Sequence, residues 1–483
     1  MARARPLTAA SAAPKLRAMS DSRVSSSRLG RLTRLAFLGR RALPIAIERF
    51  RETAEAPPAE RGRLAARALA KHGDLADKAA RTLGDMKGIA LKVGQMLSYM
   101  DGAIPADYAE VYQQVLARLQ QDAPALRWEA VRPVLERELG PLPRHFAAFD
   151  EAPFAAASIG QVHRAVRHDG RVVAVKVQYP GVDAAMRSDL KNAELFQTLM
   201  TPFASVLGAG RSTRAYAREI MGEIRDRLLE ELDYEREAAM QTRFRALFAD
   251  DPDLIVPEVH PDLSTGRVLT TAFTPGRTLQ AVCADASQPE RDRYGTVLTR
   301  AVFASLYEHG LFNADPHPGN YLFPDDGRVV LLDYGCVKEI PPAMRADMRA
   351  YLRAAIVATR TGAASDWARF DAAATRALHL DPAQPQIFGL YRDFLLYVLR
   401  PTLSDAPFDF TSAYTKESID RVLDGARETV FGKGKLPRLP EVPEVPADYT
   451  FINRLQWGFY AILAMLRARV NGYAQLPEDL RAP

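Results

Sequence analysis

Cysteine and long apolar runs are both scarce in this sequence. The 483 residues include only two cysteines, Cys283 and Cys336, which cannot form a disulfide framework and lack the spacing of a zinc site. No run of about 18 apolar residues is free of charge. The nearest candidate, residues 457–466, is ten residues long and precedes Arg467. With 47% hydrophobic and 25% charged residues, the chain is globular, with material for about two to four domains or one large two-lobed enzyme with extensions.

Acidic residues are nearly absent from the N-terminal segment. Residues 1–47 contain ten Lys and Arg and one Asp, a net charge of +9, whereas the whole chain carries +5, so the remainder sums to −4. This Ser-, Ala- and Arg-rich composition is shared by transit peptides, by segments that lie on an anionic membrane surface and by solvated tails. The remainder shows no stripe of Lys and Arg with interleaved aromatics, so we expect no nucleic-acid partner.

The hydrophobic pattern changes along the chain from helical to strand-like and back. Residues 60–120 have the spacing of helices, whereas 161–166 and 171–177 are strand-like and flank a His-Asp-Gly turn signal. After residue 277 the pattern is mostly helical, apart from a turn-and-strand region at 313–335. We therefore expect an α+β fold of two lobes. Its predicted parts are a basic leader at 1–60, a helical extension at 61–150, a small β-rich lobe with inserted helices at 151–276 and a large helical lobe at 277–483.

Candidate metal ligands lie in the turn-and-strand region. Asp315 and Asn320 are five residues apart in a proline-stiffened loop, and Asp333 directly follows the strand-like segment RVVLL. Carboxylate and carboxamide oxygens suit Mg²⁺, which leaves room for phosphate oxygens. Protein kinases have the same spacing between the catalytic-loop Asp and a metal-binding Asn, followed by Asp-Phe-Gly. Alone, an Asp and an Asn at this spacing mean little, because both residues are common in turns.

Lys176 is a second candidate, at the centre of the apolar segment VVAVKVQ. A buried lysine needs a partner, and protein kinases pair such a strand lysine with a helix glutamate to hold phosphates. By itself, a lysine on the wet face of an edge strand is the simpler interpretation; in order with Asp315, Asn320 and Asp333, the phosphate role is favoured. The glutamate is expected from a later helix, where six acids fall within twelve residues: Asp226, Glu230, Glu231, Asp233, Glu235 and Glu237.

Taken together, six segments resemble the signature motifs of the UbiB family of atypical kinases, also called AarF or ADCK-type. They are LKVGQ at 91–95, AAASIGQVHRA at 155–165, VAVKVQYPGV at 173–182, ELDYEREA at 231–238, ADPHPGN at 314–320 and LLDYG at 331–335. The resemblance runs over about residues 80–340 in the right order and spacing. It implies a protein-kinase-like fold that carries an N-terminal helical extension.

The resemblance also implies roles for individual residues. Lys176 would hold phosphates, with Glu237 as its ion-pair partner, and Asp315 would be the catalytic aspartate. Asn320 and Asp333 would bind the metal. An alanine-rich loop would replace the usual glycine-rich phosphate cover, and its residues are Ala155, Ala156, Ala157, Ser158, Ile159, Gly160 and Gln161.

An inserted helix, which carries Lys92 and Gln95, would cross the cleft and meet Glu231 and Asp233 of a second insert. A cleft occluded by charged helices does not readily admit a protein segment. A new helix pattern begins within about ten residues of Asp333, with no Ala-Pro-Glu-type anchor for a peptide-binding activation segment. The sequence therefore favours a small or lipid-like substrate, or ATP hydrolysis coupled to a conformational step.

Three positions depart from the expected pattern. Asn313 stands where the family has histidine, Ala272 where it tends to have glutamate at the lobe junction, and Tyr334 where kinases have phenylalanine. Asparagine can still hydrogen-bond, and adenine is held at the junction mainly by backbone groups. The hydroxyl of Tyr334 needs a partner.

The expected function is that of a Mg²⁺-dependent ATP-binding atypical kinase or ATPase, which by resemblance supports ubiquinone or other isoprenoid-lipid metabolism at a membrane surface. Expected partners are a nucleotide, an isoprenoid lipid or quinone precursor, the membrane surface and quinone-biosynthesis proteins. The expected location is cytoplasmic and peripheral to the cytoplasmic membrane, or the mitochondrial matrix face. The alternative is a nucleotide-gated scaffold or lipid chaperone with little turnover. An antibiotic-type phosphotransferase is less favoured, because such enzymes keep an open cleft.

Overall fold

A computed structural model of the chain describes residues 125–187 except 158 and 185, residues 229–380, 385–415 and 447–481, and a few single residues beside them. The predicted leader, most of the predicted helical extension, and Lys92, Gln95 and Ser158 lie outside the described residues. Within them, no helix is both long and apolar enough to cross a membrane.

The small lobe is built on an antiparallel sheet of order β1-β3-β4-β6, with β2 paired to β3. The predicted turn between β3 and β4 is present, and Gly170 supplies its positive φ of 86°. Alternate residues of β4 are buried against α5, which forms one core of this lobe. Its elements are α5 (Trp128–Leu139), β1 (Phe146–Phe149), β2 (Ala155–Ala156), β3 (Gly160–Arg167), β4 (Val172–Gln178) and β6 (Val268–Ala272).

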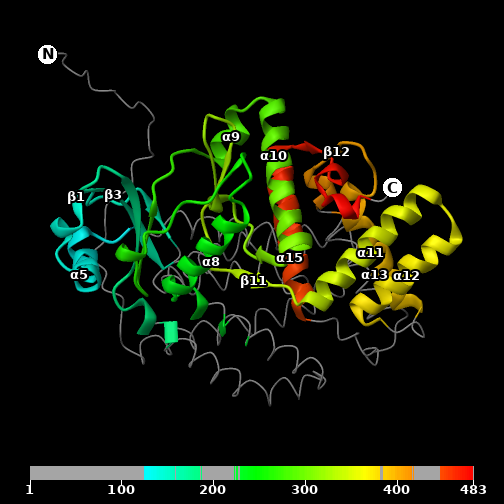
Figure 1. The fold of residues 1–483 in the computed structure, drawn as a ribbon, viewed down its shortest axis with the longest axis horizontal. Helices are drawn as coiled ribbons and strands as arrows, with labels where there is room; N and C mark the ends of the chain where they lie inside the picture. The colour runs from blue at the N-terminus through cyan, green and yellow to red at the C-terminus, as the bar shows by residue number, and fades with distance from the viewer. Residues whose placement is uncertain are drawn as a thin grey trace, which may run out of the picture.

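Helix α8 (Tyr234–Leu247) connects the lobes. Asp233 caps its N-terminus by accepting a hydrogen bond from the backbone N–H of Arg236, which fixes where the helix begins. Tyr234, its first residue, packs in a core cluster of the small lobe, whereas Phe244 packs in the core of the large lobe. The helix is therefore anchored in both lobes and lies between the sheet and the helices of the large lobe (Figure 1).

Short strands at the front of the large lobe carry the polar loops. Strand β10 pairs with both β5 and β9, and β8 pairs with β11, so residues on either side of the predicted metal loop are tied to neighbouring strands. The strands are β5 (Leu254–Ile255), β7 (Arg277–Thr278), β8 (Leu311–Asn313), β9 (Tyr321–Phe323), β10 (Val329–Leu331) and β11 (Val337–Glu339).

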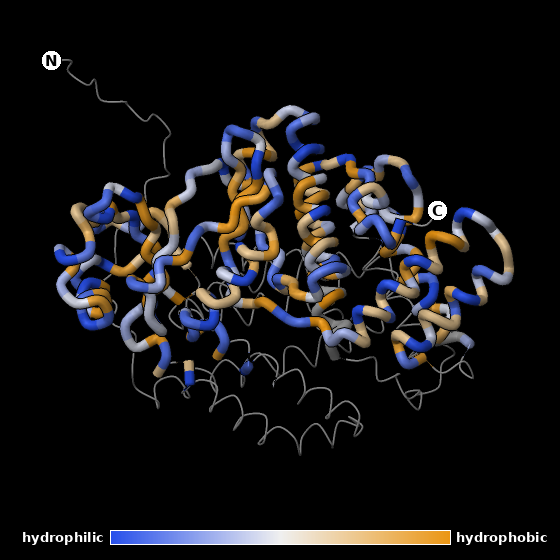
Figure 2. The backbone as a smooth tube through the Cα atoms, in the orientation of Figure 1, coloured by the Kyte–Doolittle hydropathy of each residue, from blue (hydrophilic) through white to orange (hydrophobic). Residues whose placement is uncertain are grey.

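Helices make up the rest of this lobe around one large apolar core. Helices α10 and α15 lie side by side in its centre (Figure 1), and hydrophobic segments run along α15 and the neighbouring strands (Figure 2). The helices are α9 (Leu279–Asp285), α10 (Gln288–Phe303), α11 (Pro342–Thr361), α12 (Ala364–Leu378), α13 (Pro385–Leu399) and α15 (Ala447–Leu466), with the strand pair β12 (Phe408–Asp409) and β13 (Arg469–Val470).

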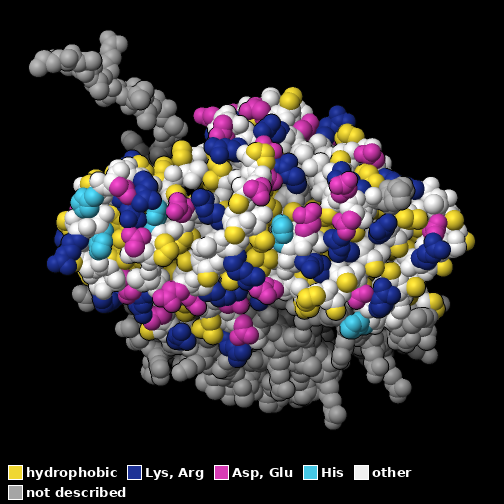
Figure 3. Space-filling view, in the orientation of Figure 1, with side chains coloured by type: hydrophobic (Ala, Val, Ile, Leu, Met, Phe, Trp, Pro, Cys, Tyr) yellow, Lys and Arg dark blue, Asp and Glu magenta, His cyan; other side chains and the backbone are white. Residues whose placement is uncertain are grey.

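The architecture confirms the predicted α+β fold of a β-rich lobe and a helical lobe. Strand β1 joins the sheet although its residues fall within the range predicted for the helical extension. On the face in Figure 3, acidic and basic side chains are interspersed over the described residues, so this face presents no field of one sign.

Candidate functional site

Lys176 and Glu237 form the central ion pair of the cleft. The ammonium of Lys176 donates to Oε1 of Glu237 at 2.7 Å and to Oε2 at 2.9 Å. Strand β4 supplies the lysine and α8 supplies the glutamate, so the sheet and the helix are brought together by this contact. Glu237 is 4% exposed and Lys176 is 20% exposed, so the glutamate is the more deeply buried partner.

The carboxylate of Asp333 affects the pKa values of both Lys176 and Glu237. Burial alone lowers the pKa of Lys176, but the carboxylates of Glu237 and Asp333 raise it above its ordinary value, and the amine keeps its proton. Burial raises the pKa of Glu237, with a further contribution from Asp333, while Lys176 acts in the opposite direction. Three residues that lie far apart along the chain therefore share one site.

The alanine-rich segment forms a tight turn beside this pair. Ala155 and Ala156 pair with Val162 and Gln161, and the N–H of Ala157 donates to the carbonyl of Gly160. Gly160 is required by close packing, because a methyl group there would lie 2.2 Å from the carbonyl oxygen of Val177. The turn thus lies close against β4, the strand of the phosphate lysine.

Two side chains of the predicted cover, those of Ile159 and Gln161, are buried. Ile159 is 2% exposed and packs in the small-lobe core. The side chain of Gln161 accepts from the backbone N–H of Leu126 and bonds to His163, so it is directed into the lobe. Because both side chains are directed into the small lobe, these two residues can contact a phosphate only through their backbone groups.

The side chains of two asparagines hold the loop at residues 314–320, which carries the predicted catalytic residue Asp315 and is called the catalytic loop below. Oδ1 of Asn313 accepts from the N–H of Asp315, and its Nδ2 donates to the carbonyl of Asp333 at 2.6 Å. Nδ2 of Asn320 donates to the carbonyl of Asp315 at 2.9 Å. Asn313 therefore links the catalytic loop to the metal loop despite replacing histidine. The amide oxygen of Asn320 is the end that can ligate a cation.

Hydrogen bonds also fix the segment at residues 332–335, which carries the predicted metal ligand Asp333 and is called the metal loop here. Oδ1 of Asp333 accepts from the N–H of Gly335, and the buried hydroxyl of Tyr334 finds its partner in the carbonyl of Leu331. The ring of Tyr334 lies 5.1 Å from that of Phe244, which connects this loop to α8.

In the described part of the chain, no three His, Cys, Asp or Glu side chains converge into a metal cluster. The donors present at the cleft are the carboxylate of Asp333 and the amide oxygen of Asn320. This set fits a Mg²⁺ ion that takes its other ligands from phosphate and water. The residues therefore suit a metal carried in with a nucleotide.

Glu231 and Asp233 of the predicted second insert have different roles in the described structure. Asp233 is exposed and caps α8, whereas Glu231 is half-buried and acts electrostatically on Glu237. Their predicted meeting with Lys92 and Gln95 stays a prediction, since both lie outside the described residues. At the lobe junction, Ala272 ends β6 and its N–H donates to the carbonyl of Glu258.

Sequence reasoning missed Arg236, the neighbour of Glu237. Its guanidinium donates to the carbonyls of Gly335 and Val337 and lies 3.6 Å from a carboxylate oxygen of Glu230. These contacts clamp α8 to the chain directly after Asp333. No spacing in the sequence distinguishes this arginine from others in an acid-rich helix, so only the packing of α8 against β11 reveals it.

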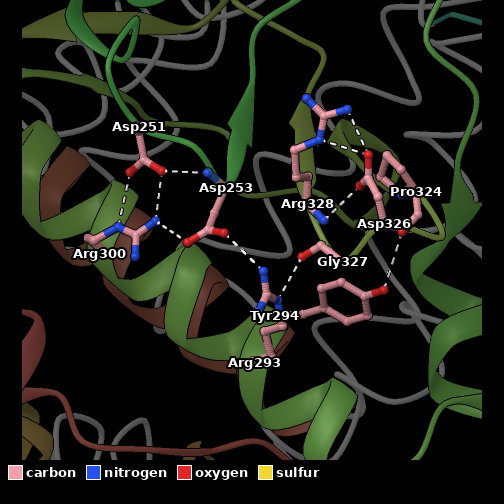
Figure 4. Close-up of polar contacts among 9 residues, drawn as sticks. All are labelled: Asp251, Asp253, Arg293, Tyr294, Arg300, Pro324, Asp326, Gly327 and Arg328. Atoms are coloured by element: carbon pink, nitrogen blue, oxygen red, sulfur yellow. Dashed lines mark hydrogen bonds and ion pairs between the residues drawn. The ribbon is translucent and has the colours of Figure 1, made fainter.

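An ion-pair network supports the hairpin between the two loops (Figure 4). Arg300 of α10 bonds to Asp251 and Asp253, which precede β5, and Arg293 bonds to Asp253 and to the carbonyl of Gly327. Because Gly327 lies in the turn between β9 and β10, the network fixes this hairpin to α10. The ends of the hairpin lead to Asn320 and Asp333, so the network supports the two residues that are predicted to bind a metal.

Comparisons with known proteins agree with this geometry. The sequence profile of the ABC1 atypical kinase-like domain matches residues 118–365. The rat (Rattus norvegicus) protein named "Atypical kinase COQ8B, mitochondrial" is 38% identical over 263 residues, 54% of this chain and 47% of its own length. The Arabidopsis thaliana chloroplastic protein "ACTIVITY OF BC1 COMPLEX KINASE 3" is 35% identical over 266 residues, 53% of this chain and 35% of its own. The match thus spans less than half of these relatives.

A solved structure is similar over most of the chain. The Mycobacterium tuberculosis protein Rv3197, in complex with erythromycin, matches with a TM-score of 0.58 and 30% sequence identity. The match covers 86% of this chain and 99% of that one.

Proposed function

Because the chain belongs to the ABC1 atypical kinase-like family, the UbiB family whose signature motifs it carries, we propose that it binds ATP with Mg²⁺ and turns it over. The single observation that carries this proposal is the Lys176 and Glu237 pair, which shares one electrostatic site with Asp333. Such a pair beside a metal-binding carboxylate is what phosphoryl transfer requires.

In the proposed reaction, Lys176 holds the phosphates, oriented by Glu237, while Asn320 and Asp333 ligate the metal. Bound Mg²⁺ would supply neutralisation of the charge on the phosphate oxygens. Asp315 accepts the proton of an attacking water or hydroxyl as its oxygen bonds to the γ-phosphorus and the bond to the ADP oxygen breaks.

The acceptor in this proposal is water or a small, lipid-like alcohol. Only eight residues separate Asp333 from α11 at Pro342, and three of them form β11, paired with β8. This connection leaves no long segment to dock a peptide, which supports a non-protein acceptor. By the family resemblance, the pathway served is ubiquinone or other isoprenoid-lipid metabolism, at the cytoplasmic face of a membrane or the mitochondrial matrix face.

ATP turnover by the purified full chain tests the proposal. We expect Mg²⁺-dependent release of ADP, stimulated by vesicles that contain anionic lipid, and loss of turnover in Asp333→Asn with metal-free nucleotide binding retained. If the wild type binds ATP but shows no metal-dependent hydrolysis or transfer, even with vesicles, the scaffold alternative replaces the enzyme. Absence of any ATP binding would refute both.

A further inference from the structure

Tyr234 has a buried hydroxyl group with nothing to bond. The residue is 1% exposed, and among the residues that the structure describes no hydrogen-bond partner reaches its hydroxyl oxygen. Buried polar groups are nearly always paired, and an unmade bond costs about 1–3 kcal/mol. An unpaired buried hydroxyl beside Lys176 therefore points to a partner that a ligand supplies.

The position of this hydroxyl links the phosphate cover to the phosphate lysine. A methyl group placed on Gly160 would lie 3.1 Å from the hydroxyl oxygen, so the oxygen reaches the alanine-rich turn. The ring lies 4.9 Å from the ammonium of Lys176. Tyr234 also precedes Glu237 by three residues on α8, which places both side chains on one face of the helix.

The hydroxyl keeps its proton and can donate a hydrogen bond. Burial raises the pKa of Tyr234 above its ordinary value, although Lys176 opposes the shift, so the proton stays on the oxygen at neutral pH. The nearby carboxylates make other contacts, since both oxygens of Glu237 accept from Lys176 and Oδ1 of Asp333 accepts from Gly335. Because no described residue bonds to the hydroxyl, we consider an acceptor on a bound ligand as its partner.

We propose that Tyr234 is a phosphate-binding residue, whose hydroxyl donates a hydrogen bond to a non-bridging phosphate oxygen of the nucleotide held between the alanine-rich turn and Lys176. The inference rests on the proposed ATP binding and adds a specificity contact to it. A phosphate oxygen is the acceptor that fits this place, because the alanine-rich turn and the protonated amine of Lys176 adjoin the hydroxyl, and the carboxylates of Glu237 and Asp333 nearby are offset by that amine and, in the proposed function, by Mg²⁺. The hydroxyl group then completes a donor set that is otherwise backbone N–H and one ammonium.

Tyr234→Phe removes the hydroxyl alone and tests the proposal in the full chain. We expect the variant without ligand to be at least as stable to heat as the wild type, because an unpaired buried group is lost. We expect its affinity for MgATP to fall about 10-fold or more, since a hydrogen bond to a charged group is lost. Adenosine, which has no phosphate, should bind both proteins equally, and the AMP, ADP and ATP series locates the phosphate contacted.

Tyr414→Phe is the matched control. Tyr414 is buried in the helical lobe, and its hydroxyl donates to the carbonyl of Tyr397 at 2.9 Å. That variant should lose thermal stability and keep its affinity for ATP, the reverse of the result for Tyr234→Phe.

Three outcomes are distinguishable. A Tyr234→Phe variant that binds ATP as tightly as the wild type overturns the inference, and means that water serves the hydroxyl. Equal losses for adenosine and ATP also overturn it, since the ring would then only shape the pocket. If the wild type itself binds no ATP, the proposed function fails together with this inference.

Discussion

The two charged clusters of this protein are built in opposite ways. Lys176 and Glu237 form a single pair in which the glutamate is 4% exposed, next to an unpaired tyrosine hydroxyl. In the helical lobe, Arg300 pairs with Asp251 and Asp253, Arg293 also pairs with Asp253, and these four side chains are 15% to 53% exposed. A buried single pair stabilises a fold little, because desolvation offsets its attraction, whereas a shared, wetter network tolerates the loss of one bond. In the proposed function the first cluster binds a ligand, whereas the second supports the fold.

Removing Lys176 should have the largest effect, because it leaves the carboxylate of Glu237 buried without a partner. We expect Lys176→Met to lower the free energy of unfolding by about 3 kcal/mol and to abolish detectable ATP binding. Chemical denaturation and nucleotide titration measure the two effects. In Lys176→Met with Glu237→Leu, most of the stability should return while binding stays lost. Recovery of binding in the double variant would show that the pair is structural.

Helix α15 packs against the catalytic loop at Pro316, and a substitution of Gly458 tests whether this contact positions the loop. A methyl group on Gly458 would lie 2.3 Å from Cγ of Pro316, next to Asp315. Since overpacking of this kind costs about 1–3 kcal/mol, we expect Gly458→Ala to displace the catalytic loop and to reduce ATP turnover about 10-fold. Binding of metal-free ATP should change less than about twofold, because Lys176 and the alanine-rich turn are on the other lobe.

Gly389→Ala is the control for this change, because the added methyl group meets nothing within 4 Å on α13. A double variant with Pro316→Ala removes the ring atom that clashes. Turnover measured in the four combinations should show coupling between positions 458 and 316. Two results would show that α15 does not act through the catalytic loop. One is a loss of turnover in Gly389→Ala as large as in Gly458→Ala, and the other is additive effects on turnover of the substitutions at positions 458 and 316.

Much of this site could be predicted from the sequence, because local patterns determine it. The spacing of Asp315, Asn320 and Asp333 and the strand around Lys176 depend on residues close in the chain. Contacts between distant elements could not be predicted. Arg236 looks like one more charge on an acidic helix, and Gly458 like an ordinary helix glycine, until α8 meets β11 and α15 meets Pro316. The direction of Gln161 into the lobe depends likewise on Leu126, which lies 35 residues away.

A substitution of Arg300 tests whether the ion-pair network of the helical lobe stabilises the fold without affecting ATP binding. We expect Arg300→Met to lower the free energy of unfolding by about 1–2 kcal/mol, less than Lys176→Met, because its carboxylate partners keep water and, for Asp253, Arg293. Affinity for metal-free ATP should stay within about twofold of the wild type. Denaturation at low and high salt checks the first effect, which screening should reduce. A larger loss of ATP affinity than of stability would contradict the division between the clusters.

The smallest effect is expected from His163, a buried group of the small lobe that lies away from the ion pair. Its Nε2 accepts from Nε2 of Gln161 and its Nδ1 donates to the carbonyl of Asp150, so the neutral ring is fully bonded. Burial lowers the pKa of His163 below its ordinary 6.5, although the carbonyl and carboxylate of Asp150 raise it. Protonation would set two donors against each other at Gln161.

A depressed pKa stabilises the folded state above the unfolded value, and this stability is lost as the pH falls from about 6.5 through the folded value. We therefore expect the free energy of unfolding to decline over that window in the wild type and to decline less in His163→Gln, which keeps a donor and an acceptor but does not titrate. Parallel profiles for the wild type and His163→Gln would show that the pKa of His163 is not lowered on folding. They would contradict the fully bonded, neutral ring that distinguishes His163 from the unpaired hydroxyl of Tyr234.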